Sequence, residues 1–137
     1  MSLRTAAVSI ALVSGLALAA CGSDGKSDEA AAEQEASPAQ ARAEIGATRR
    51  ALDSAVASLR EGDAKAADEA VSEGYLEHFE KVEGPLGKVD HGLTEKLEDS
   101  IREELRAKIQ DGGSVAEVTR MVSEIKGDLA TAERKLR

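Results

Sequence analysis

Apolar residues recur every three or four positions along most of the chain after residue 37, which is the spacing of one face of an α-helix. The stripes fall into four segments, and the last segment is the most regular. Their members are Ile45, Leu52, Val56 and Leu59; Val71, Tyr75, Phe79 and Val82; Leu93, Leu97, Ile101 and Leu105; and Val115, Val118, Val122, Ile125, Leu129, Ala132 and Leu136. The pattern predicts four amphipathic helices.

Capping and helix-breaking residues separate these segments. Three of the predicted helices start at a residue whose side chain can accept a hydrogen bond from the first turn, and glycine follows each of the first three helices. The boundaries are a capping box at Ser37-Pro38-Ala39-Gln40 and a stop at Gly62; a cap at Asp63 and a stop at Gly84-Pro85; a start near Asp90 and a stop after Gln110 at Gly112-Gly113; and a second capping box from Ser114 to Glu117. The fourth helix then runs nearly to Arg137.

Short connections between helices favour antiparallel neighbours. We therefore expect an all-α fold, an up-down-up-down four-helix bundle over residues 38–137. About 100 residues suffice for one modest core. The low aromatic content, 1% of the chain, agrees with helix packing through small aliphatic side chains rather than with a β-sandwich.

The first 20 residues carry a different signal. Arg4 precedes an apolar run that is shorter than the roughly 20 residues a spanning helix needs, which is typical of a signal peptide. The segment Leu18-Ala19-Ala20-Cys21 resembles the lipobox of bacterial lipoproteins, in which the cysteine thiol receives a diacylglycerol and becomes the first mature residue. We expect an extracytoplasmic protein anchored to a bacterial membrane through Cys21. The alternative is that Cys21 is an ordinary residue near an ordinary cleavage site.

Residues 21–37 are rich in Gly, Ser, Ala and acidic residues and show no apolar periodicity, which predicts a flexible linker. The chain has 137 residues with a net charge of −8, and removal of residues 1–20 would lower it to −9 because Arg4 is the one charged residue there. This acidic balance argues against nucleic-acid binding. One cysteine excludes a disulfide scaffold.

Carboxylates cluster on the second predicted helix, within one arc opposite its apolar stripe. They are Glu69, Glu73, Glu77, Glu80 and Glu83. One interpretation is a solvated acidic face. The other is a site for a hard cation such as Fe³⁺, Ca²⁺ or Mn²⁺, which prefers carboxylate oxygens. Like charges four residues apart destabilise a helix, and in this helix only Glu77 is followed by a base, Lys81, at the favourable distance of four residues.

Several polar residues lie at the edges of the apolar stripes, where they would face a neighbouring helix. Glu98 and Glu104 flank the third stripe, and His78 flanks the second, where it is expected as a hydrogen-bonded structural histidine, with a metal ligand as the alternative. Tyr75 is either a core residue or a phenolate that reaches a site. His91 is expected on the surface. The sequence has no di-iron motif, phosphate loop or nucleophile elbow, so we predict that the protein is not an enzyme.

One stretch resembles a known family. Tyr75-Leu76-Glu77-His78-Phe79-Glu80-Lys81-Val82-Glu83, followed by Leu97-Glu98 and the run from Leu105 to Ile109, is similar to the extracytoplasmic helical domain of bacterial high-affinity iron permeases. The resemblance covers about residues 62–137. It implies iron handling outside the cytoplasmic membrane, with Glu80, Glu83 and Glu98 at the family's carboxylate positions.

The chain also departs from that family. The permease's membrane helices and its Arg-Glu-x-x-Glu motif are absent, and Arg102-Glu103-Glu104-Leu105-Arg106 has Arg in place of the second Glu. We therefore expect a separate lipoprotein that binds iron or assists iron uptake, with an iron permease or another envelope protein as its partner. The alternative is a lipid-tethered helical adaptor that docks an envelope protein and has no metal role.

Overall fold

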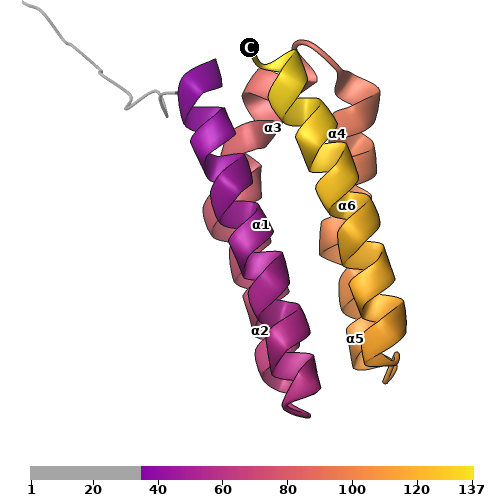
Figure 1. The fold of residues 1–137 in the computed structure, drawn as a ribbon. Coiled ribbons are helices and arrows are strands. Elements are labelled where there is room, and N and C mark those ends of the chain that lie inside the picture. Colours follow the sequence, from indigo (N-terminus) through magenta and orange to yellow (C-terminus); the bar gives the residue numbers. More distant parts are fainter. Residues whose placement is uncertain (1–34) are drawn as a thin grey trace, which may run out of the picture. The chain divides into compact units, whose positions relative to one another are not determined.

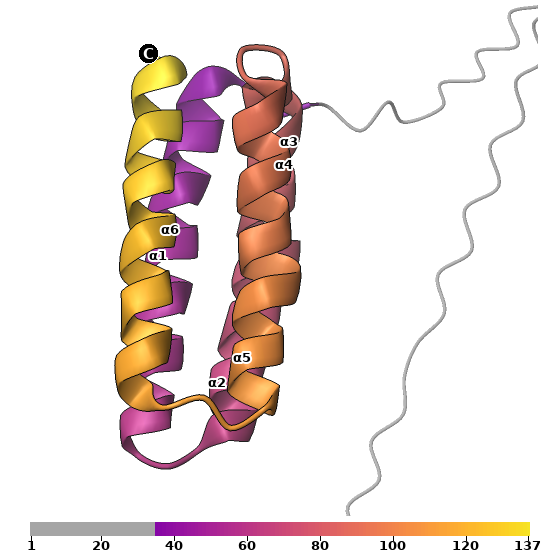
Figure 2. The same cartoon turned by 90° about the vertical axis from the view of Figure 1, so that its right-hand side faces the viewer.

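The computed structural model describes residues 35–137, and 85% of this region is helical, in four helices and without a strand. The prediction of an all-α fold is confirmed. The four helices are α1 (Pro38–Arg60); a second made of α2 (Ala64–Glu73), η1 (Gly74–Phe79) and α3 (Glu80–Gly87); a third made of α4 (His91–Glu98), η2 (Asp99–Leu105) and α5 (Arg106–Gln110); and α6 (Val115–Lys135). They lie side by side, and the chain turns back at each short connection (Figures 1 and 2).

The predicted capping residues start the helices as expected. The Ser37 hydroxyl accepts from the Gln40 amide at 3.3 Å, while the Ser37 amide donates to the Gln40 side chain at 2.8 Å. Ser114 and Glu117 form the second capping box in the same way. Gly62 and Gly112 end their helices with φ of 84° and 76°, in the left-handed region that favours glycine. Local sequence therefore sets these boundaries.

One predicted boundary was wrong. The second helix does not stop at Gly84-Pro85 but continues to Gly87, with Pro85 inside α3. Proline removes one backbone donor and crowds the preceding turn, which makes an early stop the expected outcome. Here Pro85 lies in the last turn and is buried, as is its neighbour Leu86. Burial of this apolar pair against the core offsets the single lost hydrogen bond.

Two π-helical segments, which the sequence pattern did not predict, interrupt the second and third helices. These are η1, which carries Tyr75 and Phe79, and η2, which carries Arg102. A π-helix bonds each carbonyl to the amide five residues on, so it widens the turn and shifts the rotational phase of the residues that follow. Segments of this kind occur frequently at functional sites.

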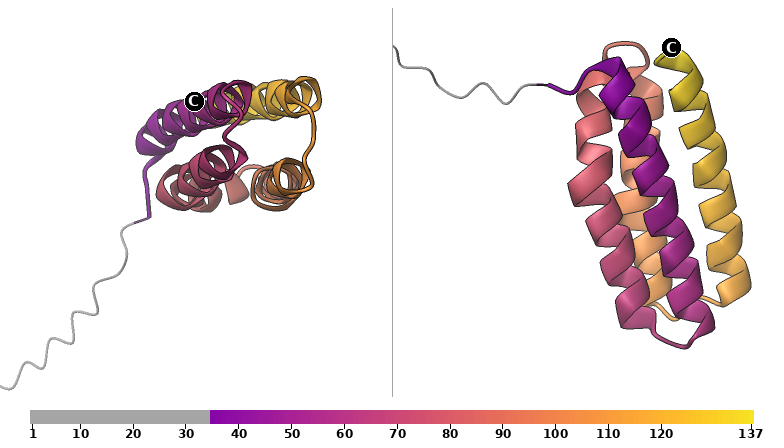
Figure 3. Two further views of the ribbon diagram at one scale, coloured as in Figure 1. Left: turned by 90° about the horizontal axis from the view of Figure 1, so that it is seen from below. Right: turned by 60° about the vertical axis from the view of Figure 1, so that its left-hand side comes forward.

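The core runs along the length of the helices between their four apolar stripes. Seen along their length, α1 and α6 lie beside each other, and the second and third helices lie beside each other across the core (Figure 3). Nearly all predicted stripe residues are buried; Leu59, Leu93 and Val115 are only half-buried. The largest fully buried side chain is that of Phe79 in η1.

The predicted signal peptide, the lipidation site Cys21 and residues 21–34 of the predicted linker lie outside the described residues. No helix within residues 35–137 combines the length and the apolar character needed to cross a bilayer.

Candidate functional site

Tyr75 lies at the centre of the candidate site. Its ring is buried, with 6% of the residue exposed, and it packs in a tilted arrangement on Phe79 with 6.0 Å between ring centroids. Its hydroxyl donates to Glu83 Oε1 at 2.7 Å. Burial raises the pKa of Tyr75, and the adjacent Glu83 carboxylate raises it further. Tyr75 is thus a core residue whose hydroxyl stays protonated and donates to a carboxylate, which agrees with the core role and not with a phenolate.

The three predicted metal ligands belong to two helices around this hydroxyl. Glu80 begins α3 and is exposed, Glu83 is half-buried one turn later, and Glu98 ends α4 and is half-buried. Burial raises the pKa of Glu83, and the negative charges of Glu98 and Glu80 raise it further, whereas the hydrogen bond from Tyr75 opposes this effect. The three carboxylates therefore interact electrostatically.

Arg102 of η2 supplies a positive charge at this cluster. Its Nη1 lies 3.0 Å from Glu98 Oε1, and its Cζ lies 5.8 Å from the centroid of the Tyr75 ring. The positive charge of Arg102 lowers the pKa of Glu83, although less than burial raises it. In this arrangement Glu98 already has a cationic partner, whereas Glu83 is bonded to a neutral phenol.

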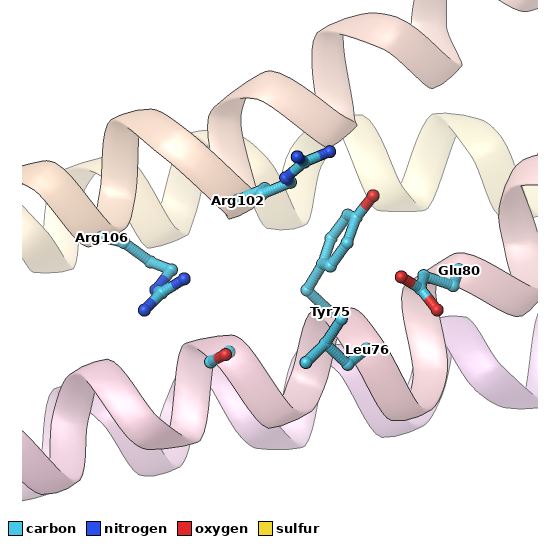
Figure 4. A pocket seen from close by; sticks show the side chains of 6 residues that line it. Tyr75, Leu76, Glu80, Arg102 and Arg106 are labelled. Atoms are coloured by element: carbon cyan, nitrogen blue, oxygen red, sulfur yellow. The ribbon is translucent and has the colours of Figure 1, made fainter.

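A cleft of about 250 Å³ opens beside Tyr75 between η1 and η2 (Figure 4). It is lined by Ser72, Tyr75, Leu76, Glu80, Arg102 and Arg106. Arg106 is held from the second helix by Asp68, with Nε to Oδ1 at 2.8 Å and Nη2 to Oδ2 at 3.1 Å. This bond from Arg106 holds the pKa of Asp68 below its ordinary value.

The structure does not bring the predicted ligands into a metal-binding geometry. Within residues 35–137, no group of three or more His, Cys, Asp or Glu side chains is placed to hold a metal ion. Binding through Glu80, Glu83 and Glu98 would need Glu83 to share or release the Tyr75 hydroxyl and Glu98 to release Arg102. The assignment of Glu80, Glu83 and Glu98 as iron ligands stays a prediction.

The other three carboxylates of the predicted cluster lie on the outer surface of the second helix. Glu69, Glu73 and Glu77 are exposed, and Lys81 lies 3.8 Å from Glu44 of α1 rather than pairing with Glu77. Glu83 differs from the expected solvent-facing position because it turns toward Tyr75. The prediction used the period of a regular α-helix, whereas η1 changes the rotational phase of the residues that follow it.

The polar residues at the stripe edges have local partners. His78 Nδ1 lies 2.7 Å from Glu44 Oε2, which agrees with a structural histidine that faces a neighbouring helix. His91 is exposed and lies 3.3 Å from Glu95. Glu104 is exposed and accepts from Ser100 at 3.3 Å. None of these three residues joins the Tyr75 cluster.

Sequence reasoning missed Arg102 and the bond between Tyr75 and Glu83. Tyr75 and Glu83 are eight positions apart, which is about 80° on a regular helical wheel. They therefore lack the i,i+3 or i,i+4 spacing of side chains that are neighbours on a helix. Arg102 was noted only as part of a motif mismatch. The one available signal was its position four residues after Glu98, the spacing of a helical ion pair.

Replacing Glu83 by Gln in metal-free protein should raise stability at neutral pH. A carboxyl group whose pKa is raised in the folded state binds more protons when folded, so the free energy of unfolding falls as pH rises from the ordinary value of 4.5 through the raised one. Gln does not ionise and still accepts from Tyr75. Urea unfolding at several pH values should show that Glu83→Gln raises the free energy of unfolding near pH 7 and that this gain shrinks toward pH 4. Replacement of the exposed Glu77 by Gln should change the free energy of unfolding little at either pH.

Comparisons of the chain with protein-family models, curated proteins and solved structures found no match. The resemblance to the helical domain of iron permeases is therefore an expectation from the residues around Tyr75.

Proposed function

We propose that this protein is an extracytoplasmic lipoprotein, anchored through Cys21, whose helical domain binds iron or assists iron uptake. The finer architecture that we propose is an antiparallel up-down-up-down four-helix bundle behind a signal peptide and a linker. Glu80 and Glu83 would supply ligands from the second helix, and Glu98 would supply a ligand from the third. A hard cation suits this donor set because carboxylate oxygens are its preferred ligands.

The observation that carries this proposal is the environment of Glu83. It is half-buried, its pKa is raised by burial and by two other carboxylates, and its hydrogen-bond donor is the neutral Tyr75 hydroxyl. Such a group costs the folded protein stability at neutral pH, and costs of this kind are typical of functional positions. A bound cation would neutralise the repulsion among the three carboxylates.

Iron binding is tested by calorimetric titration of residues 21–137 carrying Cys21→Ser, with anaerobic Fe²⁺, Fe³⁺-citrate, Ca²⁺ and Mn²⁺ at moderate salt. We expect saturable iron binding that is lost in the Glu80→Gln/Glu83→Gln double variant. The matched control is Glu73→Gln/Glu77→Gln, which removes the same charge from exposed positions of the same helix. Equal affinity in all three proteins would contradict the ligand assignment, and circular dichroism would verify that helicity is unchanged.

The lipid anchor is tested separately. Expressed in a bacterium with its own signal peptide, the full chain should be found in the membrane fraction and should incorporate a labelled fatty acid, because two or three acyl chains anchor a protein stably. Cys21→Ser should abolish the labelling and move the protein to the soluble extracytoplasmic fraction. Ser23→Ala, two residues further on, should behave like the parent. Labelling that persists in Cys21→Ser would rule out Cys21 as the acceptor.

A second candidate function is the docking of an envelope protein without a metal. It is favoured by Leu76, which is 53% exposed in the wall of the cleft. Leu76→Ser should then weaken capture of an envelope partner, while leaving iron binding unaffected. Capture should also weaken with ionic strength if the charges around the cleft contribute to docking.

A further inference from the structure

Two guanidinium groups line the same side of the cleft. Arg102 and Arg106 lie one turn apart on the third helix, and both border the space that holds Tyr75 and Leu76 (Figure 4). Each is paired with a carboxylate, Arg102 with Glu98 and Arg106 with Asp68. These contacts use one donor of Arg102 and two donors of Arg106, from the five N–H groups that each guanidinium carries.

This arrangement suits recognition of an anion. A guanidinium whose orientation is already fixed by a carboxylate of the protein loses less side-chain freedom when it binds a ligand. Its planar set of donors also matches the two oxygens of a carboxylate. A ligand with one negative charge meets less repulsion here than one with several, because Glu80 lines the same cleft and Glu98 and Asp68 already pair with the two guanidiniums.

The rest of the cleft is suited to an apolar group. Leu76 and Val89 are the two large hydrophobic residues that are exposed within residues 35–137, and Leu76 is the one that lies at the cleft beside the Tyr75 ring. The volume of about 250 Å³ is below the roughly 300–1,000 Å³ of pockets for drug-sized ligands. A molecule with only a few carbon atoms fits these dimensions.

We propose that this cleft binds a small organic monocarboxylate. Arg102 and Arg106 bind the carboxylate, and Leu76 and the Tyr75 ring contact the apolar part. Both walls carry π-helical segments, η1 with Tyr75 and Leu76 and η2 with Arg102, and such segments are frequent at functional sites. This site goes beyond the proposed iron function, because Arg106 and Leu76 take no part in the carboxylate cluster.

The test compares three six-carbon probes that differ only in their polar group: hexanoate, hexanol and hexylammonium. Tyr75 is the only tyrosine and the chain has no tryptophan, so its fluorescence reports on the cleft directly. We use chelator-treated residues 21–137 with Cys21→Ser, a chain that contains every described helix. Hexanoate should change the Tyr75 emission saturably and should shift the Arg102 and Arg106 side-chain NMR signals, whereas hexanol and hexylammonium should have much weaker effects.

Variants then test the named residues. Arg102→Gln and Arg106→Gln should each weaken hexanoate binding about tenfold or more, because each loses a charge-assisted hydrogen bond. Arg120→Gln, which removes an equal charge from an exposed position of α6, should bind like the parent. Equal responses to the three probes, or no saturable response to hexanoate, would overturn the proposal even if a variant failed to fold. Because the protein is metal-free, neither result depends on iron binding.

Discussion

Replacing Phe79 by Ala should lower the free energy of unfolding by about 3–5 kcal/mol. Phe79 has the largest of the fully buried side chains, and its ring packs on Tyr75 at the level of the candidate site. Alanine removes the buried ring and leaves a cavity that the surrounding helices fill only in part. A domain of this size has about 5–15 kcal/mol of stability in total, so the loss is a large fraction of it.

The measurement is urea unfolding followed by circular dichroism, and Leu76→Ala is the matched control. Leu76 lies in the same π-helical segment but is 53% exposed, so its truncation should change stability by no more than about 0.5 kcal/mol. A small effect for Phe79→Ala, comparable with that of Leu76→Ala, would contradict the burial of Phe79. A large loss should also alter the Tyr75 fluorescence, because the two rings are in contact.

The helices could be predicted from the sequence because their determinants are local. Ser37 and Ser114 form capping boxes with the residue three positions on, and Gly62 and Gly112 adopt the positive φ that ends a helix. The apolar stripes needed only the helical period. Pro85 shows the limit of local reasoning, since its stop signal was outweighed by burial against neighbouring helices.

The candidate site was predicted less well because its geometry depends on two irregular segments. The sequence pattern placed Glu80 and Glu83 on one helix and Glu98 on the next, but it placed Glu83 on the solvent side. The phase shift at η1, and with it the bond from Tyr75 to Glu83 within the same helix, could not be derived from a regular helical wheel. Arg102, which pairs with Glu98, lies in the second irregular segment, so a regular helical wheel does not give its position either.

The two irregular segments also connect stability with the candidate site. Tyr75 and Phe79 of η1 belong to the core, whereas the Tyr75 hydroxyl, Glu83 and Arg102 form the polar cluster. A change in the backbone of η1 should therefore affect both properties together. The residue best placed to test this is Gly74, the first residue of η1, because its backbone packs closely against α1.

Replacing Gly74 by Ala should destabilise the protein by about 1–3 kcal/mol, although alanine is intrinsically the better helix former. A Cβ at this position would lie 2.6 Å from the Cβ of Ala51 in α1, so the two helices would have to move apart. Gly127→Ala is the opposite case. Gly127 is exposed inside α6 with nothing within 4 Å of an added Cβ, so the same change should stabilise by roughly 0.5–1 kcal/mol.

Urea unfolding of the two variants compares the same substitution at two helical glycines and should give effects of opposite sign. Stabilisation by Gly74→Ala would show that η1 and α1 are not in close contact. If Gly74→Ala also shifts the Tyr75 fluorescence and weakens hexanoate binding, the approach of η1 to α1 sets the position of the cleft wall. Ala51→Gly, which removes the opposing methyl group, should restore part of the stability lost in Gly74→Ala, because it relieves the close contact between the two helices.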